Sequence, residues 1–381
     1  MTLIAPSLAF ARGGGKGSSF RRGHGHGHHG GGKTLHYYIQ AEEVDWDYAP
    51  WYPGPNPIFG TDQDLLGENV FLSSSQGIGD TYKKAVYREY TKNFGKLKDR
   101  PAYLGTLGPI IYAEVGDTIK VHLRNATSIN VSIHPHGVKY AKDSEGAFYA
   151  DGTSGRDAAD DIVIPGGEHT STWEVPERAG PGPNDPSSVV WVYHSHTPNV
   201  VAEIQAGLSG VLVITKEGMA KTGADGRPHP KDVDREIVTL WAVFDENRSM
   251  YIDYNARKYC GHPTCGLSEE DFEESNLMHS INGLLWTDDD DEGEPMYRVN
   301  QGEKVRLYIG ALGSEVDLHT PHLHGVTLVD HGGHRTDVPE VLAGAFKVYD
   351  MTADNAGEWI YHCHIEDHVA AGMATNMTID P

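Results

Sequence analysis

The chain repeats one series of motifs, and this internal repeat limits its architecture more than any other feature. Each half contains a Gly-led segment with alternating apolar residues, then His-x-His-Gly, and later Trp-x-Tyr-His-x-His. These motifs begin at Gly116, His134 and Trp191 in the first half. They begin at Gly302, His322 and Trp359 in the second. A series that recurs in this order indicates that one fold is used twice.

The repeat predicts two homologous domains, at 35–217 and 233–381, in a chain of 381 residues. The Gly/Pro/Lys-rich stretch 218–232 is expected to link them. Residues 1–34 precede the first domain, and they contain a Gly- and His-rich segment that cannot form a core. We interpret that segment as a flexible linker or tag, with loose metal capture as the alternative.

The local pattern is that of an all-β protein. Short alternating or β-branched runs are bounded by Gly and Pro, which number 45 and 21. The predicted strands are Thr118–Leu123, Ile129–Ile133, Val190–Tyr193, Val211–Thr215, Ile237–Trp241, Lys304–Ile309 and Thr375–Ile379. The best short helix candidate is Glu269–Glu274. This pattern favours β-sandwich or β-barrel domains.

Charge and composition exclude several classes of partner. The net charge is −23, which argues against a nucleic-acid binder and against an anionic membrane surface. No apolar stretch approaches the roughly 18 residues of a membrane span. The acidic run Asp288–Asp291 is expected to be a solvated face. The chain has 22 His and only 3 Cys, which points to metal chemistry and not to a disulfide scaffold.

The paired histidines predict metal sites in both halves. Residues i and i+2 of a strand point to the same face, so His-x-His aims two imidazoles at one place. Neutral imidazole suits copper, and four such pairs in a repeat are hard to explain as surface or core residues. The second half adds His319, Cys363, His368 and Met373. Two His, a thiolate and a weak axial Met form a blue electron-transfer copper site.

These motifs resemble those of the multicopper oxidases, and most closely the ceruloplasmin-like members, over nearly the whole chain beyond residue 34. The resemblance implies two cupredoxin-like Greek-key β-barrels and four coppers per chain, one of type 1, one of type 2 and two of type 3. The type 1 ligands would be His319, Cys363, His368 and Met373. The type 2 ligands would be His134 and His322. The type 3 ligands would be His136, His194, His196, His324, His362 and His364.

The first half departs from this pattern at its own type 1 positions. Alignment of the repeats places Val131, Ser195, Val200 and Gln205 where the ligands would stand. The first domain should therefore hold no type 1 copper but half of a trinuclear site. The resemblance to small two-domain laccases implies a homotrimer, in which domain 1 of one subunit meets domain 2 of the next. A closed monomer is the alternative.

The resemblance implies an oxidase that takes single electrons from a small reductant at type 1 copper and reduces O₂ to water at the trinuclear site. The reductant would be Fe(II) or an organic phenol or aromatic amine. The alternatives are a nitrite reductase-like copper trimer and a non-catalytic copper-binding protein. The positions that resemble the iron site of ceruloplasmin are Glu274, His279, Asp367 and Glu315, the last from the next subunit. The other interpretation is that the acids among them are solvated rim residues or hydrogen-bond supports for the ligands.

Two features suggest export. Leu8-Ala9-Phe10-Ala11 follows a short apolar run and has the small-x-small form of a signal cleavage site. Cys260 and Cys265 lie in one short loop, where they form either a local disulfide or a pair of free thiols.

Overall fold

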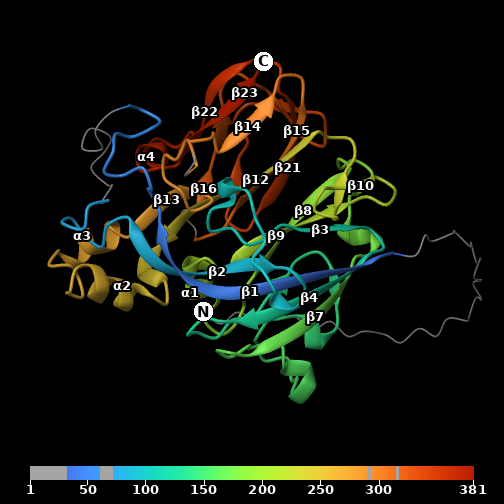
Figure 1. Ribbon diagram of the computed structural model, residues 1–381, viewed down its shortest axis with the longest axis horizontal. Helices are drawn as coiled ribbons and strands as arrows, with labels where there is room; N and C mark the ends of the chain where they lie inside the picture. The colour runs from blue at the N-terminus through green and yellow to red at the C-terminus, as the bar shows by residue number, and fades with distance from the viewer. Residues whose placement is uncertain (1–31, 61–71, 291–292, 315–316) are drawn as a thin grey trace, which may run out of the picture. The chain divides into compact units, whose positions relative to one another are not determined.

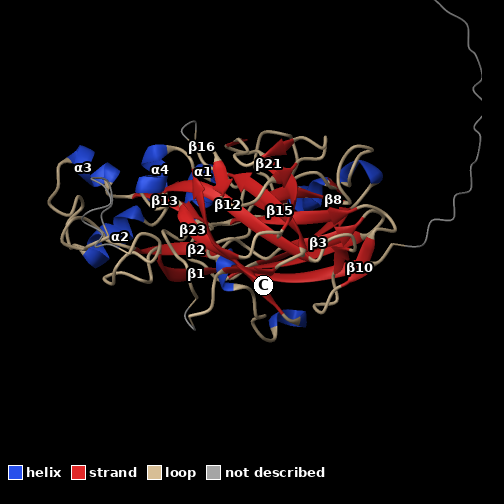
Figure 2. Cartoon of the chain, turned by 90° about the horizontal axis from the view of Figure 1, so that it is seen from above, coloured by secondary structure: helices blue, strands red, loops and turns tan. Residues whose placement is uncertain are grey.

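The computed structural model of the chain describes residues 32–60, 72–290, 293–314 and 317–381 (Figure 1). The leader-like start, the His-rich segment up to residue 31, and Glu315 lie outside these ranges. Strands form most of the regular secondary structure, and the short helices lie at its margins (Figure 2). Among the described residues, no helix is both long and apolar enough to cross a bilayer.

The N-terminal half consists of two sheets with an apolar core between them. One sheet has the order β2-β1-β4-β7-β6 and the other β3-β9-β8-β5. The strands are β1 (Thr34–Asp47), β2 (Thr81–Tyr90), β3 (Ile111–Glu114), β4 (Thr118–Asn125), β5 (His134–Pro135), β6 (Lys139–Tyr140), β7 (Glu168–Glu174), β8 (Ser188–His194) and β9 (Ser209–Thr215). Strand β4 alternates between buried and half-buried residues, as expected for a strand with one face on the core.

The C-terminal half repeats this arrangement. Its sheets have the orders β13-β12-β15-β21-β18-β19 and β14-β23-β22-β17, and β16 pairs with β20 beside them. The strands are β12 (Arg235–Asp245), β13 (Leu277–Ile281), β14 (Tyr297–Asn300), β15 (Lys304–Ala311), β16 (Leu318–His319), β17 (Pro321–Leu323), β18 (Leu328–Val329), β19 (Arg335–Thr336), β20 (Val341–Leu342), β21 (Phe346–Thr352), β22 (Gly357–Cys363) and β23 (Ala374–Asp380).

Pairing directions match between the halves. Strand β1 pairs in parallel with β4, as β12 does with β15. Strand β8 runs antiparallel to both β5 and β9, as β22 does to β17 and β23. The parallel pair β3–β9 corresponds to β14–β23. The repeat seen in the sequence is therefore also a repeat of topology.

Short helices complete the two halves. The α-helices are α1 (Val200–Ala206), α2 (Ile252–Tyr259), α3 (Glu269–Glu274) and α4 (Glu366–Ala370). The 3₁₀ turns are η2 (Lys92–Phe94), η3 (Ala102–Leu104), η4 (Lys142–Ser144), η5 (Gly155–Ala158), η6 (Glu177–Ala179) and η7 (Glu246–Arg248). The predicted helix Glu269–Glu274 is confirmed, and the Ser268 hydroxyl caps it by accepting the N–H of Asp271.

Two local predictions differ from the structure. The predicted strand Ile129–Ile133 contains only an isolated bridge between Val131 and Val163, because the Ser132 N–H is taken by the Ser195 hydroxyl. The expected linker contains a hairpin of β10 (Ala220–Thr222) and β11 (Pro228–Pro230). An Asp225-Gly226 turn closes it, with Gly226 at φ 77°, a conformation that glycine adopts readily.

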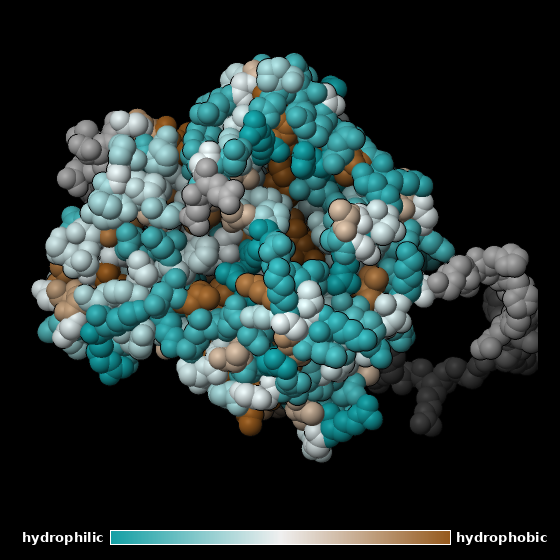
Figure 3. Space-filling view, in the orientation of Figure 1, coloured by the Kyte–Doolittle hydropathy of each residue, from teal (hydrophilic) through white to brown (hydrophobic). Residues whose placement is uncertain are grey.

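Buried contacts join the two halves. One apolar cluster includes Val192 and Val213 of the first half together with Leu240 and Tyr308 of the second. The Lys84 ammonium, fully buried on β2, pairs with the Glu246 carboxylate in η7. The face seen in Figure 3 is mainly hydrophilic, and hydrophobic residues show in small separate areas and in hollows. The halves therefore share a continuous interior.

The acidic run after Trp286 is only partly a solvated face. Asp289 is exposed, Asp288 is half-buried, and Asp291 lies outside the described residues. Burial, together with the negative charges of Asp289 and Glu358, raises the pKa of Asp288 to about 6. The folded chain therefore binds a proton at Asp288 more readily than the unfolded chain does.

Replacing Asp288 by Asn should stabilise the protein at pH 8 and leave it unchanged at pH 4. A raised carboxyl pKa makes folding less favourable as pH rises from about 4 to about 6, because the charged form is disfavoured in the folded state. The check is the difference in Tm between variant and unmodified protein across this range. Asp157→Asn, at an exposed position, is the control and should show no such trend. A pH-independent difference at Asp288 would contradict the assignment.

Candidate metal centres

The first candidate centre is a buried group at the end of β22. Ligand atoms of His319, Cys363 and His368 all lie within 4.8 Å of one another. The Nδ1 atoms of His319 and His368 are 3.1 Å apart, and the Cys363 Sγ lies 3.6 Å from the His368 Nδ1. Three separate segments, β16, β22 and α4, supply these side chains.

Met373 is held beside this group by the backbone. The Cys363 N–H donates to the Met373 carbonyl at 3.0 Å, and the Met373 N–H donates to the His368 carbonyl at 3.0 Å. Gly372 precedes it at φ 135°, and a Cβ there would come within 2.6 Å of Leu285 Cγ. The turn that returns Met373 to Cys363 therefore needs a glycine.

Neighbouring groups prepare the three side chains to bind a metal. The Asp317 carboxylate lies 3.3 Å from the His319 Nε2, which directs the Nδ1 of the same ring toward the other ligands. Burial alone raises the pKa of the Cys363 thiol, but hydrogen bonds from His319, His368 and the Thr320 N–H outweigh it. They lower that pKa to about 6. The thiolate is therefore the favoured form at neutral pH.

The second group consists of four histidines on β17, β22 and the residues that follow them. His322 and His362 face each other in register, and the Nε2 atoms of His324 and His362 are 3.2 Å apart. The Nδ1 of His322 bonds the Asp337 carbonyl, and the Nδ1 of His362 bonds the Cys363 carbonyl, each at 2.8 Å. These bonds leave the Nε2 atoms of both rings available as ligands.

The third group has the same form in the N-terminal half. His134 and His194 face each other in register on β5 and β8, and the Nε2 atoms of His136 and His194 are 3.3 Å apart. The Nδ1 of His134 bonds the Glu145 carbonyl at 2.6 Å, and that of His194 bonds the Ser195 carbonyl at 2.8 Å. Burial and the neighbouring rings lower the pKa of His136 and of His194 to about 4. These two imidazoles are therefore neutral and able to ligate at pH 7.

The two groups of four are separate within one chain. Ring centroids inside the N-terminal group are 5.4 to 5.7 Å apart. Those inside the C-terminal group are 4.6 to 5.6 Å apart. Across the described ranges, no ring contact joins a histidine of one group to a histidine of the other. The fourth histidine is His196 in the N-terminal group and His364 in the C-terminal group.

Both halves of the chain match protein-family models with the same description. Two family models described as multicopper oxidase match residues 104–218 and 268–381, which together are more than half of the chain. The chain belongs to the multicopper oxidase family. The family implies copper as the metal, and the donor sets fit it, because imidazole and thiolate are preferred copper ligands.

Several curated proteins are similar to this multicopper oxidase chain. Human "Ferroxidase HEPHL1" is 40% identical over 352 residues, 91% of this chain and 29% of that protein. Rat hephaestin is 39% identical over 356 residues, 92% of this chain and 30% of that protein. Mouse ceruloplasmin is 36% identical over 353 residues, 91% of this chain and 31% of that protein. The chain thus spans less than a third of the length of each of these relatives.

Solved structures agree on the fold. A crystal structure of a multicopper oxidase superposes with a TM-score of 0.55 at 19% identity, covering 91% of this chain and 89% of the other. A second, the multicopper oxidase mgLAC, superposes with the same TM-score at 18% identity, covering 91% and 86%. The predicted fold class, two cupredoxin-like Greek-key β-barrels, is confirmed.

The N-terminal barrel of this multicopper oxidase chain repeats the backbone frame around Cys363 without the candidate ligands. The Ser195 hydroxyl accepts the Ser132 N–H at 2.9 Å, as the Cys363 sulfur accepts the Thr320 N–H at 3.4 Å. Val131 bridges Val163, as His319 pairs with Val341. The predicted correspondences of Val131 and Ser195 are therefore confirmed.

The predicted correspondences of Val200 and Gln205 are wrong. The Ser195 N–H donates to the Leu208 carbonyl and the Leu208 N–H to the Glu203 carbonyl, the same bonds that link Cys363, Met373 and His368. Glu203 and Leu208 therefore occupy the His and Met positions. Helix α1 is seven residues long and α4 is five, so the connection from Ser195 is longer than its counterpart. Glu203 is fully buried, and its carboxylate accepts from the Thr197 N–H and hydroxyl.

The four predicted iron-site residues are only partly brought together. The His279 ring lies 5.2 Å from that of His368, and the Asp367 carboxylate is close enough to affect the pKa of His279. Burial and His368 lower that pKa to about 4, so the imidazole is neutral. Glu274 ends α3, and no contact in the described chain joins it to His279 or Asp367. Glu315 lies outside the described residues.

One supporting residue was missed by sequence reasoning. Asp317 is 3% exposed and accepts the Val243 N–H at 2.8 Å and the Ser314 N–H at 2.6 Å, besides facing His319. Its position two residues before His319 is a signal that could have identified it, because such residues share a face in extended chain.

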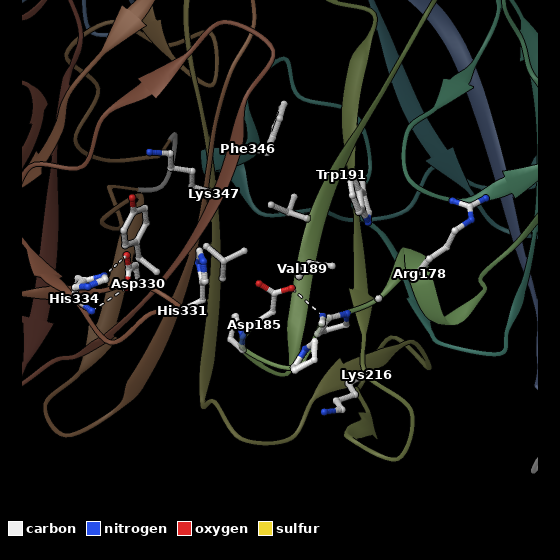
Figure 4. Close-up of a pocket in the computed structure, with 18 of the residues that line it drawn as sticks. Arg178, Asp185, Val189, Trp191, Lys216, Asp330, His331, His334, Phe346 and Lys347 are labelled. Carbon is white, nitrogen blue, oxygen red and sulfur yellow. Dashed lines mark hydrogen bonds and ion pairs between the residues drawn. The ribbon is translucent and has the colours of Figure 1, made fainter. Parts of the chain in front are cut away.

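A cavity of about 1120 Å³ lies between the two barrels, apart from the metal centres (Figure 4). Val189 and Trp191 of β8 line one side, and Phe346 and Lys347 of β21 line the other. None of the twelve predicted copper ligands is among its lining residues. Its charged groups include the pair His334–Asp330, with Nδ1 and Oδ2 3.3 Å apart.

Proposed function

We propose that the protein is a four-copper oxidase in which the two halves, at 35–217 and 233–381, act as two cupredoxin domains. The blue copper would be held by His319, Cys363, His368 and Met373, and a trinuclear cluster by the eight paired histidines. When bound, copper supplies one-electron acceptance at the blue site and four-electron reduction of O₂ to water at the cluster. One observation carries this proposal: Cys363 stands between His362 and His364, so one short segment supplies ligands to both kinds of centre.

The residues around Cys363 provide a route for electrons. Each residue spans about 3.5 Å of chain, so the thiolate and the adjacent imidazoles are separated by a few covalent bonds, on the order of 10 Å. The bond from the His362 Nδ1 to the Cys363 carbonyl offers a shorter connection between the same two side chains. Burial of Cys363 and His319 keeps water away from the thiolate.

The cluster requires the two groups of four histidines to meet. They make no ring contact within one chain among the described residues, which supports their meeting across a subunit boundary. The contact is heterologous, and a ring of three subunits closes it with three clusters. The type 2 ligands are then His134 and His322, one from each chain.

Fe(II) is the proposed reductant. Similar proteins are named ferroxidases, and His279 and Asp367 lie beside the blue-site ligand His368. Carboxylate and imidazole suit iron, and negative charge favours Fe(III) over Fe(II). Export to an oxidising compartment is part of the proposal, and the Cys260–Cys265 disulfide supports it.

The test of the oxidase is copper counting on the loaded protein, combined with O₂ consumption. Four coppers per chain, an absorption band of a coupled copper pair, and O₂ uptake with Fe(II) or a phenol are expected. A single histidine-bound copper besides the blue site would indicate nitrite reductase-like chemistry instead. Absence of O₂ uptake at full copper loading would indicate a copper-binding protein without this activity.

The iron preference has its own test. The variant Asp367→Ala should lower kcat/KM for Fe(II) by about tenfold or more, because a proposed carboxylate ligand of the iron is lost. It should change kcat/KM for a bulky phenol by less than about twofold. The control is Glu366→Ala, the exposed acidic neighbour of Asp367 on α4. Equal losses with both reductants would favour an unspecialised laccase-like oxidase.

A further inference from the structure

A second cavity, of about 410 Å³, lies where the end of β2 and the segment after it approach the β10–β11 hairpin and the start of β12. Its apolar wall includes Tyr103, Leu104, Ile110 and Tyr112. No predicted copper ligand or iron-site residue lines it. We call it the Arg88–Arg100 cavity, after two guanidinium groups in its wall.

These two arginines lack counter-ions. Neither Arg88 nor Arg100 forms an ion pair with any described residue. The Nη1 of each is buried without a hydrogen-bond partner. The Nη2 of Arg100 donates to the Gly105 carbonyl at 3.1 Å, which neutralises no charge. Each side chain thus retains donors that the protein does not use.

The remaining charged groups of the cavity wall already have partners or are exposed. The Glu89 carboxylate binds Lys98 and Arg227, each at 2.9 Å. Glu236 and Asp225 both bind His229, at 2.7 and 3.1 Å. Arg235 pairs with Glu303 at 3.3 Å, and the Asp234 carboxylate accepts the Lys304 N–H. Asp99 is exposed.

The electrostatics of the two arginines are unfavourable as they stand. Burial and the positive charge of Arg88 together lower the pKa of Arg100 to about 9. Only the phenols of Tyr193 and Tyr103 act in the other direction, and burial raises their own pKa values, so both are neutral at pH 7. Burial also lowers the pKa of Arg88, and the negative charge of Glu42 opposes this. The Glu42 carboxylate already accepts hydrogen bonds from Tyr90 and Gln40.

We propose that the Arg88–Arg100 cavity binds a small molecule that carries an oxyanion group, phosphate or carboxylate, on an apolar body. A planar guanidinium matches such a group with paired hydrogen bonds. The aromatic and aliphatic wall would cover the apolar part, and the volume is that of small-molecule sites. The anion would supply an ion-pair partner, which neither arginine has among the described residues.

The test is calorimetric titration of the full copper-loaded chain at constant ionic strength, with phenyl phosphate and with inorganic phosphate. Both should bind, and phenyl phosphate should bind more tightly because its ring contacts the apolar wall. Arg88→Gln and Arg100→Gln should each weaken phenyl phosphate binding by about tenfold or more. The matched control is Arg235→Gln in the same wall, whose guanidinium is already paired, and it should change binding by less than about threefold.

Thermal unfolding gives a second readout that does not depend on turnover. In chloride buffer without phosphate, Arg100→Gln should raise Tm because it removes a repulsive charge. Phenyl phosphate should raise the Tm of the unmodified chain but not that of this variant. The proposal is overturned if phenyl phosphate shows no saturable binding. It is also overturned if binding is the same in Arg88→Gln and Arg100→Gln as in the unmodified chain, or if Arg235→Gln weakens it equally.

Discussion

Substituting Cys363 by Ser should abolish the visible absorption of the loaded protein and reduce turnover to background. The hydroxyl has nearly the same size as the thiol but is not deprotonated at neutral pH and is a hard donor, so it does not hold copper in the blue-site geometry. The eight paired histidines are untouched. We therefore expect one copper fewer per chain and an unchanged type 2 electron paramagnetic resonance signal.

The matched control for this substitution is Ser195→Ala, because Ser195 occupies the corresponding place in the N-terminal barrel. Colour, copper content and turnover should all survive it, with a modest loss of stability from the unpaired Ser132 N–H. A blue band that persists in Cys363→Ser would refute the ligand assignment, since the other described cysteines, Cys260 and Cys265, form a disulfide.

Two inactive variants should restore activity when they share a trimer. One variant carries His136→Ala and His196→Ala, and the other carries His324→Ala and His364→Ala. Each alone should be inactive, because every cluster then lacks ligands from one side. In a mixed ring, one of the three contacts joins an intact N-terminal group to an intact C-terminal group. Purification by two different tags should therefore yield about one third of full activity.

The result separates the two possible assemblies. If each cluster formed within a single chain, every chain of the mixture would lack two of its eight cluster histidines, and no activity would return. Light scattering of the unmodified protein should show about three chains per particle, and a fully active monomer would contradict the trimer.

Regular strand geometry explains why most of the candidate site could be predicted. That His134 and His136 lie together, and likewise His322 and His324, follows from side-chain alternation and from the repeat. Glu203 and Leu208 were not predicted, because counting along the chain assumes equal helix lengths, and α1 is longer than α4.

Contacts between distant segments were beyond sequence reasoning. Arg88 lies near the end of β2 and Arg100 lies in the segment that follows this strand, and only the folded chain places both in the wall of one cavity. The same holds for the buried pair of Lys84 and Glu246, which are far apart in the chain. Asp225-Gly226 is a sequence typical of a hairpin turn, but the Gly/Pro/Lys-rich composition of 218–232 led to the prediction of a linker.

The bond from the His194 Nδ1 to the Ser195 carbonyl duplicates the one between His362 and Cys363. The N-terminal barrel thus contains the hydrogen bond that would carry electrons, but it has no blue-copper ligands beside that bond among the described residues. A second electron entry point could be built there by replacing Val131, Ser195, Glu203 and Leu208 with His, Cys, His and Met. The hydrogen bond that would connect this new site to the proposed cluster is already present, so a redesign would have to supply only the blue-copper ligands.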